Sequence, residues 1–513
     1  MISVAFDELY DLIKSLTKSE KRFFKLTVSS EDHATAISKL FDELEKAPDF
    51  DENKLLKSSK QKHKTLSQID IIQLTYTVIL KSQRTFYAEG ISGYRIKDEI
   101  SNLRNLFDKA QYKQCRKMLN KLKEESYSEE SFHFILEIIS IEKQLLDIEN
   151  KFGNTSKSLD DLIQEEQLII DKSKNIGEYA QSFSRVNYLV RQNMVAKTAK
   201  EFETYDKLLS SPLFKTTDNC SSKKAEVLYH HTRALCFSKK RDNINRQLEF
   251  KSMVTLMDKN PFLINEYPKR YLSGINNILS VEIEQAHYGT AEKLIDSFIK
   301  LKSHPAFNTT DLQLKIFTST TNAQLLIYTD GGRTDKAIPV VKYINEQIEL
   351  YKDKINKEEL LIFYYNFTSL YIYSQKYAEA SKYLNLLLSK SDTDLRQDLQ
   401  CFSRLQNIIL HYELQKIPEL KYLLKTTHDF YKNQKYQFKI EKLILELFEE
   451  LAENGESKTI WDNAHKQIKE LMHDPFEKIA NYYFDFLAYT QSKVTGEKVG
   501  DIIFDKLAQN WKK

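Results

Sequence analysis

The sequence predicts an all-α protein, and three observations lead to this fold class. Only 11 of the 513 residues are glycine and 8 are proline, well below the roughly 7% and 5% of an average protein, and sheets need such residues for their turns. Lys, Leu, Ile and Glu are the most frequent residues, and several of them are strong helix formers. Apolar residues also recur at helical spacing along most of the chain. We therefore expect nearly the whole chain to be helical.

The first 53 residues are predicted to form two helices. The first has its apolar pattern from Phe6 to Leu16 and restarts at TKSEKRFFKL, with Thr17 or Ser19 as the cap of the restarted part. The second is ATAISKLFDELEK, with apolar residues on one face.

A strong helix is predicted next, at LSQIDIIQLTYTVILKSQRTF, where Ser67 and Asp70 fit a capping pattern. AEGISGYR follows and holds two of the eleven glycines. Because glycine marks breaks between elements, we predict a small N-terminal helical domain over residues 1–95 and a helical array over residues 96–513.

From about residue 98 onward, amphipathic helices of 14–20 residues alternate with short polar breaks. The breaks lie at 126–131, 210–222, 258–262, 303–311, 330–333 and 389–394. Short breaks make neighbouring helices antiparallel, and a long series of such hairpins predicts an α-solenoid.

A recurring spacing of residues indicates how each hairpin packs. It is clearest at Tyr371, Tyr377, Ala380 and Leu384. A small residue lets the second helix approach the first, an aromatic closes the turn, and a large apolar residue one turn further on reaches back. The same frame recurs in three weaker copies: Tyr328, Gly332, Ala337 and Val341; Tyr288, Ala291 and Ile295; and Leu106, Tyr112, Cys115 and Leu119.

This frame resembles that of the tetratricopeptide-repeat (TPR) family. Ala291, Ala337 and Ala380 are 46 and 43 residues apart, against 34 in a standard repeat, so the resemblance is to the wider TPR-like class. It covers roughly residues 98–130 and 265–433. The stretches SEKRFFKL, KLFDEL and ILKSQRTF also resemble a group of uncharacterised bacterial helical-repeat proteins, which implies no activity.

The resemblance implies a non-enzymatic scaffold that binds a protein or peptide on the concave face of a superhelix. The first helix of each hairpin lines that face in the family. Carried over, it implies contacts at Asn276, Glu284, Asn322, Asp330, Tyr365, Ser369 and Tyr373. Asparagine offers donors and an acceptor to a peptide backbone, and tyrosine offers contact area.

A basic segment supports an alternative, a nucleic-acid-linked regulator. Residues 54–97 hold nine Lys or Arg and two acidic residues, whereas the whole chain has a net charge of only +3. Lys57, Lys60, Lys62 and Lys64 could contact phosphates. The stretch KSSKQKHK at 57–64 lacks interleaved aromatics, so a solvated surface loop is the simpler interpretation.

The sequence contains none of the common catalytic, nucleotide-binding or metal-binding motifs. The adjacent His230 and His231 point about 100° apart on a helix and are poorly placed to chelate one metal. TDGGRT at 329–334 is predicted to be a turn between helices. We therefore expect no enzyme activity, no cofactor and no metal site.

Several features bear on the compartment of the protein. The four cysteines are scattered, which fits a reducing environment. The N-terminus carries acidic residues where a signal peptide needs positive charge, and no stretch approaches the roughly 20 apolar residues of a membrane span. These features predict a cytoplasmic protein.

Overall fold

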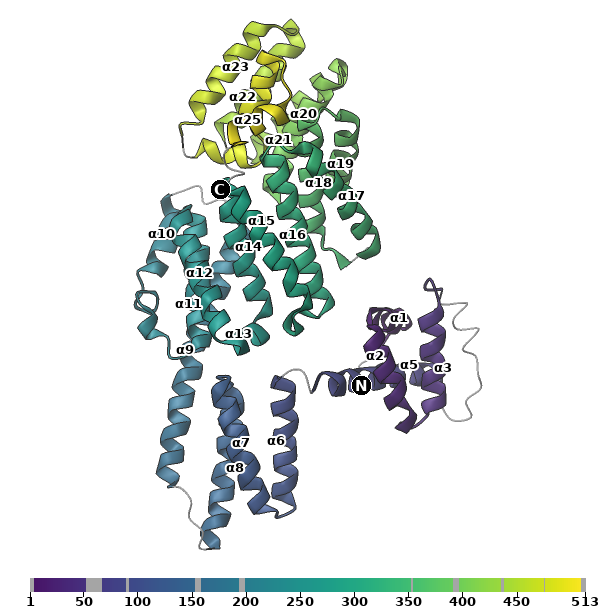
Figure 1. The fold of residues 1–513 in the computed structure, drawn as a ribbon, viewed down its shortest axis with the longest axis vertical. Helices are drawn as coiled ribbons and strands as arrows, with labels where there is room; N and C mark the ends of the chain where they lie inside the picture. Colours follow the sequence, from purple (N-terminus) through teal and green to yellow (C-terminus); the bar gives the residue numbers. More distant parts are fainter. Residues whose placement is uncertain are drawn as a thin grey trace. The chain divides into compact units, whose positions relative to one another are not determined.

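The computed structural model of the chain describes residues 4–51, 67–88, 92–152, 158–192, 199–351, 354–390, 396–434, 438–474 and 476–508. Every regular element among these residues is an α-helix or a short 3-10 helix, and none is a strand (Figure 1). The predicted all-α class is therefore confirmed for the described part of the chain.

The chain divides into two compact units, Met1–Lys174 and Asn175–Lys513. The boundary predicted near residue 95 lies inside the first unit and stays a prediction. Within that unit, the described helices before residue 89 and after residue 91 have separate hydrophobic cores.

The N-terminal core of the first unit is built from four helices, and Phe24 and Phe41 stack at its centre, 4.3 Å apart. The helices are α1 (Phe6–Ser15), α2 (Lys18–Thr27), which continues into the 3-10 helix η1 (Val28–Ser30), α3 (Ala34–Lys46) and α5 (Gln68–Ala88).

Two predicted caps begin helices of this core. The described residues 4–51 contain three α-helices, where two were predicted for residues 1–53, because the chain is extended at Leu16 and Thr17. The Thr17 hydroxyl accepts from the Glu20 amide, and the Glu20 carboxylate accepts from the Thr17 amide. Ser67 and Asp70 make the same exchange. Both predicted caps are confirmed, and Ser19 is not the cap.

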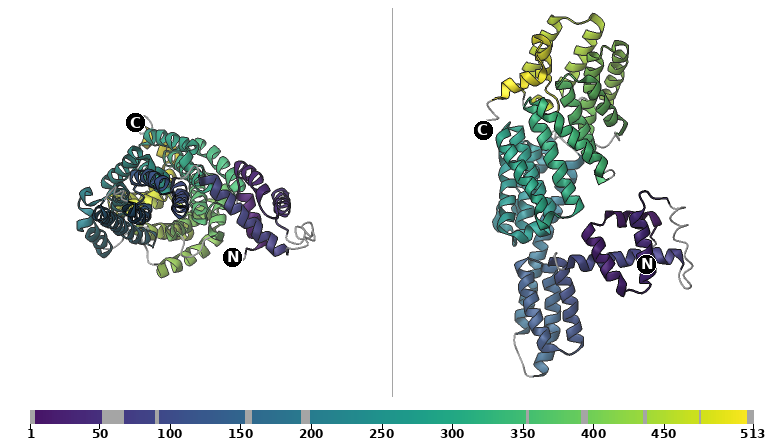
Figure 2. Two further views of the ribbon diagram at one scale, coloured as in Figure 1. Left: turned by 90° about the horizontal axis from the view of Figure 1, so that it is seen from below. Right: turned by 45° about the vertical axis from the view of Figure 1, so that its right-hand side comes forward.

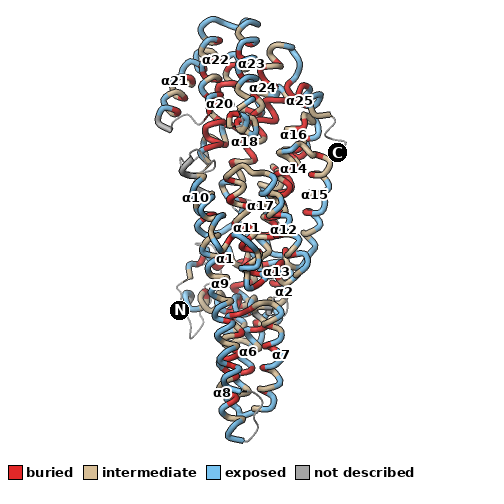
Figure 3. The backbone as a smooth tube through the Cα atoms, turned by 90° about the vertical axis from the view of Figure 1, so that its left-hand side faces the viewer, coloured by how far each residue is buried: buried red, intermediate tan, exposed pale blue. Residues whose placement is uncertain are grey.

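A second core in this unit is formed by α6 (Ser92–Asp108), α7 (Tyr112–Ser128) and α8 (Phe132–Lys151). Figure 3 shows buried positions of these helices facing one another and exposed positions facing outward. Lys123 on α7 is buried and pairs with Glu142 and Glu165, so its charge is compensated. Glu165 belongs to α9 (Leu159–Gln192).

The second unit contains the remaining helices. In chain order they are α10 (Ala199–Leu209), η2 (Pro212–Phe214), η3 (Thr217–Asn219), α11 (Lys223–Lys240), α12 (Asn243–Lys259), α13 (Pro261–Glu266), α14 (Pro268–Glu284), α15 (Tyr288–Lys300), η4 (Leu301–Ser303), η5 (Pro305–Phe307), α16 (Thr310–Asp330), α17 (Thr334–Tyr351), α18 (Lys357–Tyr373), α19 (Tyr377–Lys390), α20 (Gln397–Glu413), α21 (Ile417–Gln434), α22 (Lys439–Asn454), α23 (Lys458–Leu471), η7 (Glu477–Tyr482), α24 (Phe486–Thr495) and α25 (Val499–Leu507).

Alternate helices of this unit pack against one another. The row runs α12, α14, α16, α18, α20 and α22, each helix in contact with the next in the row. The helices between them, from α15 to α21, pack against their neighbours in sequence, and Figures 1 and 2 show α14, α15 and α16 side by side. We call α14, α16 and α18 the inner helices, because their facing sides line the cavity described below.

One tight turn recurs between successive helices in both units. A residue with positive φ follows the first helix: Ala110, Ala286, Gly332, Gln375 and Gln415, with φ between 54° and 72°. The next backbone N–H then donates to a carbonyl five residues earlier, as in Lys376 to Tyr371 at 2.8 Å and Arg333 to Tyr328 at 2.7 Å. Such bonds satisfy carbonyls that a helix end leaves unpaired. The turn predicted at 329–334 is confirmed.

Candidate functional site

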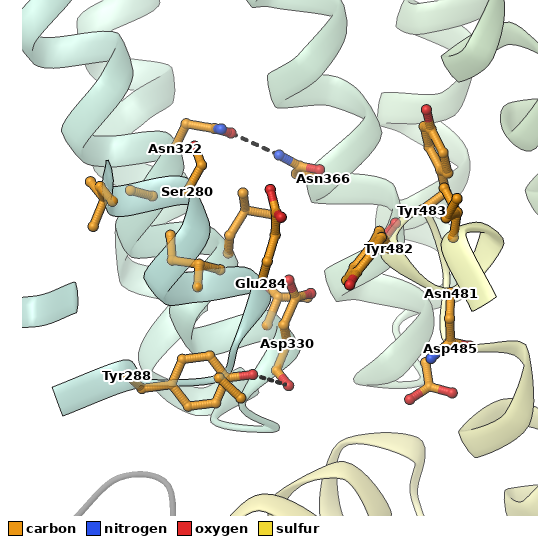
Figure 4. A pocket seen from close by; sticks show the side chains of 18 of the residues that line it. Ser280, Glu284, Tyr288, Asn322, Asp330, Asn366, Asn481, Tyr482, Tyr483 and Asp485 are labelled. Carbon is orange, nitrogen blue, oxygen red and sulfur yellow. Dashed lines mark hydrogen bonds between the residues drawn. The ribbon is translucent and has the colours of Figure 1, made fainter. Parts of the chain in front are cut away.

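The second unit contains a cavity of about 860 Å³. One wall consists of the C-terminal halves of the inner helices, together with residues at the end of α11 and the start of α12. The opposite wall consists of η7, the residues that follow it, and α25 (Figure 4). The helices α14, α16 and α18 end at Glu284, Asp330 and Tyr373, and all three residues line the cavity.

Polar side chains lie along the cavity face of each inner helix. On α14 they are Asn276, Ser280 and Glu284, spaced four residues apart, and on α16 they include Asn322 and Asp330, eight apart. Because residues four apart on a helix share a face, each set forms a stripe along its helix. An amide bond links neighbouring stripes: Asn366 Nδ2 on α18 donates to Asn322 Oδ1 at 2.7 Å (Figure 4).

The structure brings together six of the seven residues that the resemblance placed on a concave face. Asn276, Glu284, Asn322, Asp330, Ser369 and Tyr373 line this cavity. Tyr365, the seventh, is only 2% exposed and is not among the lining residues.

Three of these residues already bind other parts of the chain. The Tyr365 hydroxyl donates to the Tyr483 carbonyl at 3.0 Å, and the Asp485 amide donates to the Tyr373 hydroxyl at 2.7 Å. Ser369 Oγ accepts from Gln406 Nε2 at 2.7 Å. The two tyrosines therefore hold main-chain groups of the segment that follows η7.

This C-terminal segment is held by packing as well as by hydrogen bonds. The Tyr483 ring stacks on Phe402 of α20, with centroids 4.3 Å apart and planes 7° apart. Its hydroxyl donates to Asp398, which also pairs with Arg396. The segment was not predicted to cover the inner helices. The one signal in the sequence is its aromatic density at NYYFDF, residues 481–486.

Two carboxylates, Asp330 and Asp485, line the cavity from opposite walls (Figure 4), and five cations also belong to its lining. Burial, together with the nearby charge of Asp485, raises the pKa of Asp330 to about 7. The Asp485 carboxylate accepts from the Ala488 amide at 2.8 Å and so caps α24. A third carboxylate, Glu284, pairs with Arg246 at 2.9 Å.

Three buried atoms of the cavity lining lack hydrogen-bond partners among the described residues. They are the Thr329 hydroxyl, the Asn481 amide oxygen and Nε of Arg246. Thr329 is only 2% exposed, so water does not readily replace a protein partner. Sequence reasoning missed Thr329, Asn481 and Asp485, because only the fold brings them to one cavity.

The residues predicted to pack the hairpins lie at helix interfaces. Ala291, Ala337, Ala380 and Cys115 are fully buried, on α15, α17, α19 and α7. Tyr371 stacks on Tyr383, with ring planes 2° apart, where α18 packs against α19. The remaining two lie on α19: Tyr377 is partly buried at its first position, and Leu384 is 1% exposed.

Five of the nine basic residues of the basic segment lie outside the described residues: Lys54, Lys57, Lys60, Lys62 and Lys64. Two of its described cations are paired: Lys81 with Glu31 at 2.6 Å and Arg95 with Glu125 at 2.8 Å. The nucleic-acid alternative stays a prediction.

Among the described residues, no group of three His, Cys, Asp or Glu side chains is placed to hold a metal ion. The two adjacent histidines lie in different surroundings. His230 pairs with Glu249 at 2.7 Å, whereas His231 is buried beside Arg270.

Comparison with models of known families, with curated proteins and with solved structures finds no match for this chain. Over the part of the chain that the structure describes, no helix combines the length and the apolar character that crossing a membrane requires.

Proposed function

We propose that the protein is a non-enzymatic scaffold that binds a peptide segment of a partner protein in the cavity lined by the inner helices. On this proposal the helices from α14 to α21 form a TPR-like solenoid whose concave face is the inner-helix wall. The alternate packing of α14, α16, α18 and α20 and the recurring positive-φ turn support this arrangement.

The observation that carries the proposal is the convergence of polar stripes from three inner helices on one cavity. Its volume of about 860 Å³ lies within the range of ligand sites and suits a few residues of peptide. The stripes offer amide donors and acceptors, which are the groups that pair with a peptide main chain.

A second feature supports the same function. Tyr365 and Tyr373 already bind the main chain of residues 483 and 485 through their hydroxyls. Helix α18 therefore already recognises the main chain of one segment through hydroxyls, and such recognition does not depend on the side chains of the bound segment.

The test fills the cavity and compares the result with a matched surface change. Ser280 lines the cavity on α14, and its hydroxyl donates to the carbonyl of Asn276 at 2.9 Å. Ser297 on α15 is exposed and bonds the carbonyl of Lys293 in the same way, at 3.0 Å. Ser280→Trp puts a large ring in the cavity, whereas Ser297→Trp puts the same ring in solvent.

The full chain and both variants are used to capture partners from native extract, with and without nuclease. We expect a protein partner that survives nuclease and binds the Ser297→Trp variant, but binds Ser280→Trp at least about tenfold more weakly. Equal capture by both variants would refute the cavity as the site. Loss of all partners on nuclease treatment would favour the nucleic-acid alternative.

A further inference from the structure

The cavity contains an acidic group that no cation of the described chain neutralises. Asp330 lies at the C-terminal end of α16 and is partly buried, and no Lys, Arg or His among the described residues pairs with its carboxylate. Asp485, on the facing wall, adds a second negative charge close enough to raise the pKa of Asp330. A structural ion pair would be expected to supply a cation at such a position, because buried charges are normally compensated.

The helix ends strengthen the negative potential of this region. Three inner helices terminate at the cavity, at Glu284, Asp330 and Tyr373. The C-terminal end of a helix carries partial negative charge and favours a bound cation. A carboxylate placed there is unfavourable unless a cation comes to it.

Two of the three unpartnered atoms of the lining can accept a hydrogen bond from a bound group, and the third, Nε of Arg246, can only donate. The Asn481 amide oxygen is a buried acceptor without a donor among the described residues. The Thr329 hydroxyl, next to Asp330 on α16 and 2% exposed, also lacks a partner. Ammonium and guanidinium groups carry several donors and no acceptor, so they match a site made of carboxylates, an amide oxygen and a hydroxyl.

Five cations line the cavity: Lys239, which is buried, and Arg241, Arg246, Lys478 and Lys506. Arg246 pairs with Glu284, and Arg241 lies over the Phe476 ring at 4.8 Å. Lys478 and Lys506 are exposed. An arriving basic group would therefore not displace an existing partner of Asp330.

We propose that the cavity anchors a basic side chain, arginine or lysine, of the bound peptide, with Asp330 as the main ion partner, Asp485 as a second negative charge, and Thr329 and Asn481 as hydrogen-bond partners. This inference rests on the proposed function, because it names the chemistry of the peptide that the cavity takes.

The full chain is immobilised, and the experiment measures how well it retains pools of end-blocked pentapeptides. The residues on either side of the central position are randomised in every pool. The central residue is arginine in one pool, lysine in the second and citrulline, the uncharged analogue of arginine, in the third. Mass spectrometry quantifies what is retained. A charge-assisted contact is expected to favour the arginine and lysine pools over the citrulline pool by about 10- to 100-fold.

Matched protein variants locate the effect. Asp330→Asn removes the charge and keeps the shape, and we expect it to abolish the preference for the basic pools. Asp296→Asn makes the same change at an exposed position of α15 outside the cavity lining, and we expect it to keep the preference. The comparison of pools on the unmodified chain needs no variant, so a folding defect in a variant would not hide the result.

The outcomes separate this inference from the proposed function. Equal retention of the arginine and citrulline pools would leave peptide binding intact and overturn the cation anchor. If no pool is retained, peptide binding in the cavity is wrong, and titration with arginine amide decides the anchor. Binding of arginine amide to the unmodified chain but not to Asp330→Asn would support the anchor, and absence of binding to both would overturn it.

Discussion

Substituting Gly332 tests whether α25 is fastened directly to the turn between α16 and α17. Gly332 has a φ of +72°, and a Cβ built on it would lie 2.4 Å from the Gly500 carbonyl oxygen and 2.4 Å from the Phe504 backbone nitrogen. Both atoms belong to the backbone of α25. No side-chain rotation can relieve such a contact, so in Gly332→Ala the turn and α25 must move apart.

Two separate costs make up the expected effect. A non-glycine residue in the left-handed region costs roughly 1–2 kcal/mol. Overpacking a closely packed interface adds about 1–3 kcal/mol. Gly496→Ala serves as the control, because Gly496 has a φ of +80° and no atom within 4 Å of its built Cβ. The control carries only the first cost, and the difference between the variants measures the packing of α25.

Hydrogen exchange of the full chain, followed by mass spectrometry, measures the difference in the local stability of α25 between the two variants. A difference of 1–3 kcal/mol corresponds to roughly 5- to 150-fold faster opening. We expect amides of residues 499–507 to exchange faster by about that factor in Gly332→Ala than in Gly496→Ala. Equal exchange in the two variants would show that α25 is not packed on the turn as described, and the cavity would then lack that wall.

Two further predictions concern buried positions of the second unit. Ala380→Trp should destabilise the α18–α19 pair by about 1–3 kcal/mol or more, because Ala380 is fully buried. Ala378→Trp, at an exposed position of the same helix, should change the stability little. An unchanged urea midpoint in Ala380→Trp would contradict the interface. Burial beside Arg270 lowers the pKa of His231 to about 3. The unfolded chain therefore binds a proton at His231 below about pH 6.5, whereas the folded chain does not. The free energy of unfolding should fall by on the order of a few kcal/mol as the pH decreases from 6.5 toward 3. His231→Gln should lose this part of the pH dependence, and identical urea-unfolding profiles against pH for the two proteins would refute it.

The amino-acid sequence was enough to predict much of the local structure of this protein. Helical periodicity and the shortage of glycine and proline were enough for the all-α class, because both act within a few residues of chain. The caps at Thr17 and Ser67 were predictable for the same reason, since each bonds a residue three positions away. The spacing of Asn276 and Glu284 was likewise sufficient to place both on one helix face.

Some features of the fold left weak or ambiguous signals in the sequence. The recurring turn uses a positive-φ residue, yet the residue there is Ala286, Gln375 or Gln415 as well as Gly332. Glycine normally marks such a conformation, so its absence hid the repetition of the turn. The hydrogen bonds of the turn compensate the strain of the other residues, and only the backbone geometry shows this.

Tertiary structure alone decided what closes the cavity. The bonds from Tyr365 to residue 483 and from residue 485 to Tyr373 join positions 118 and 112 apart in sequence. No periodic pattern relates residues at such separation, because their contact depends on the path of every helix between them. For the same reason, Asp330 and Asp485 have ordinary sequence surroundings. They came close together only because the C-terminal segment packs against the inner helices, where burial and the charge of Asp485 raise the pKa of Asp330.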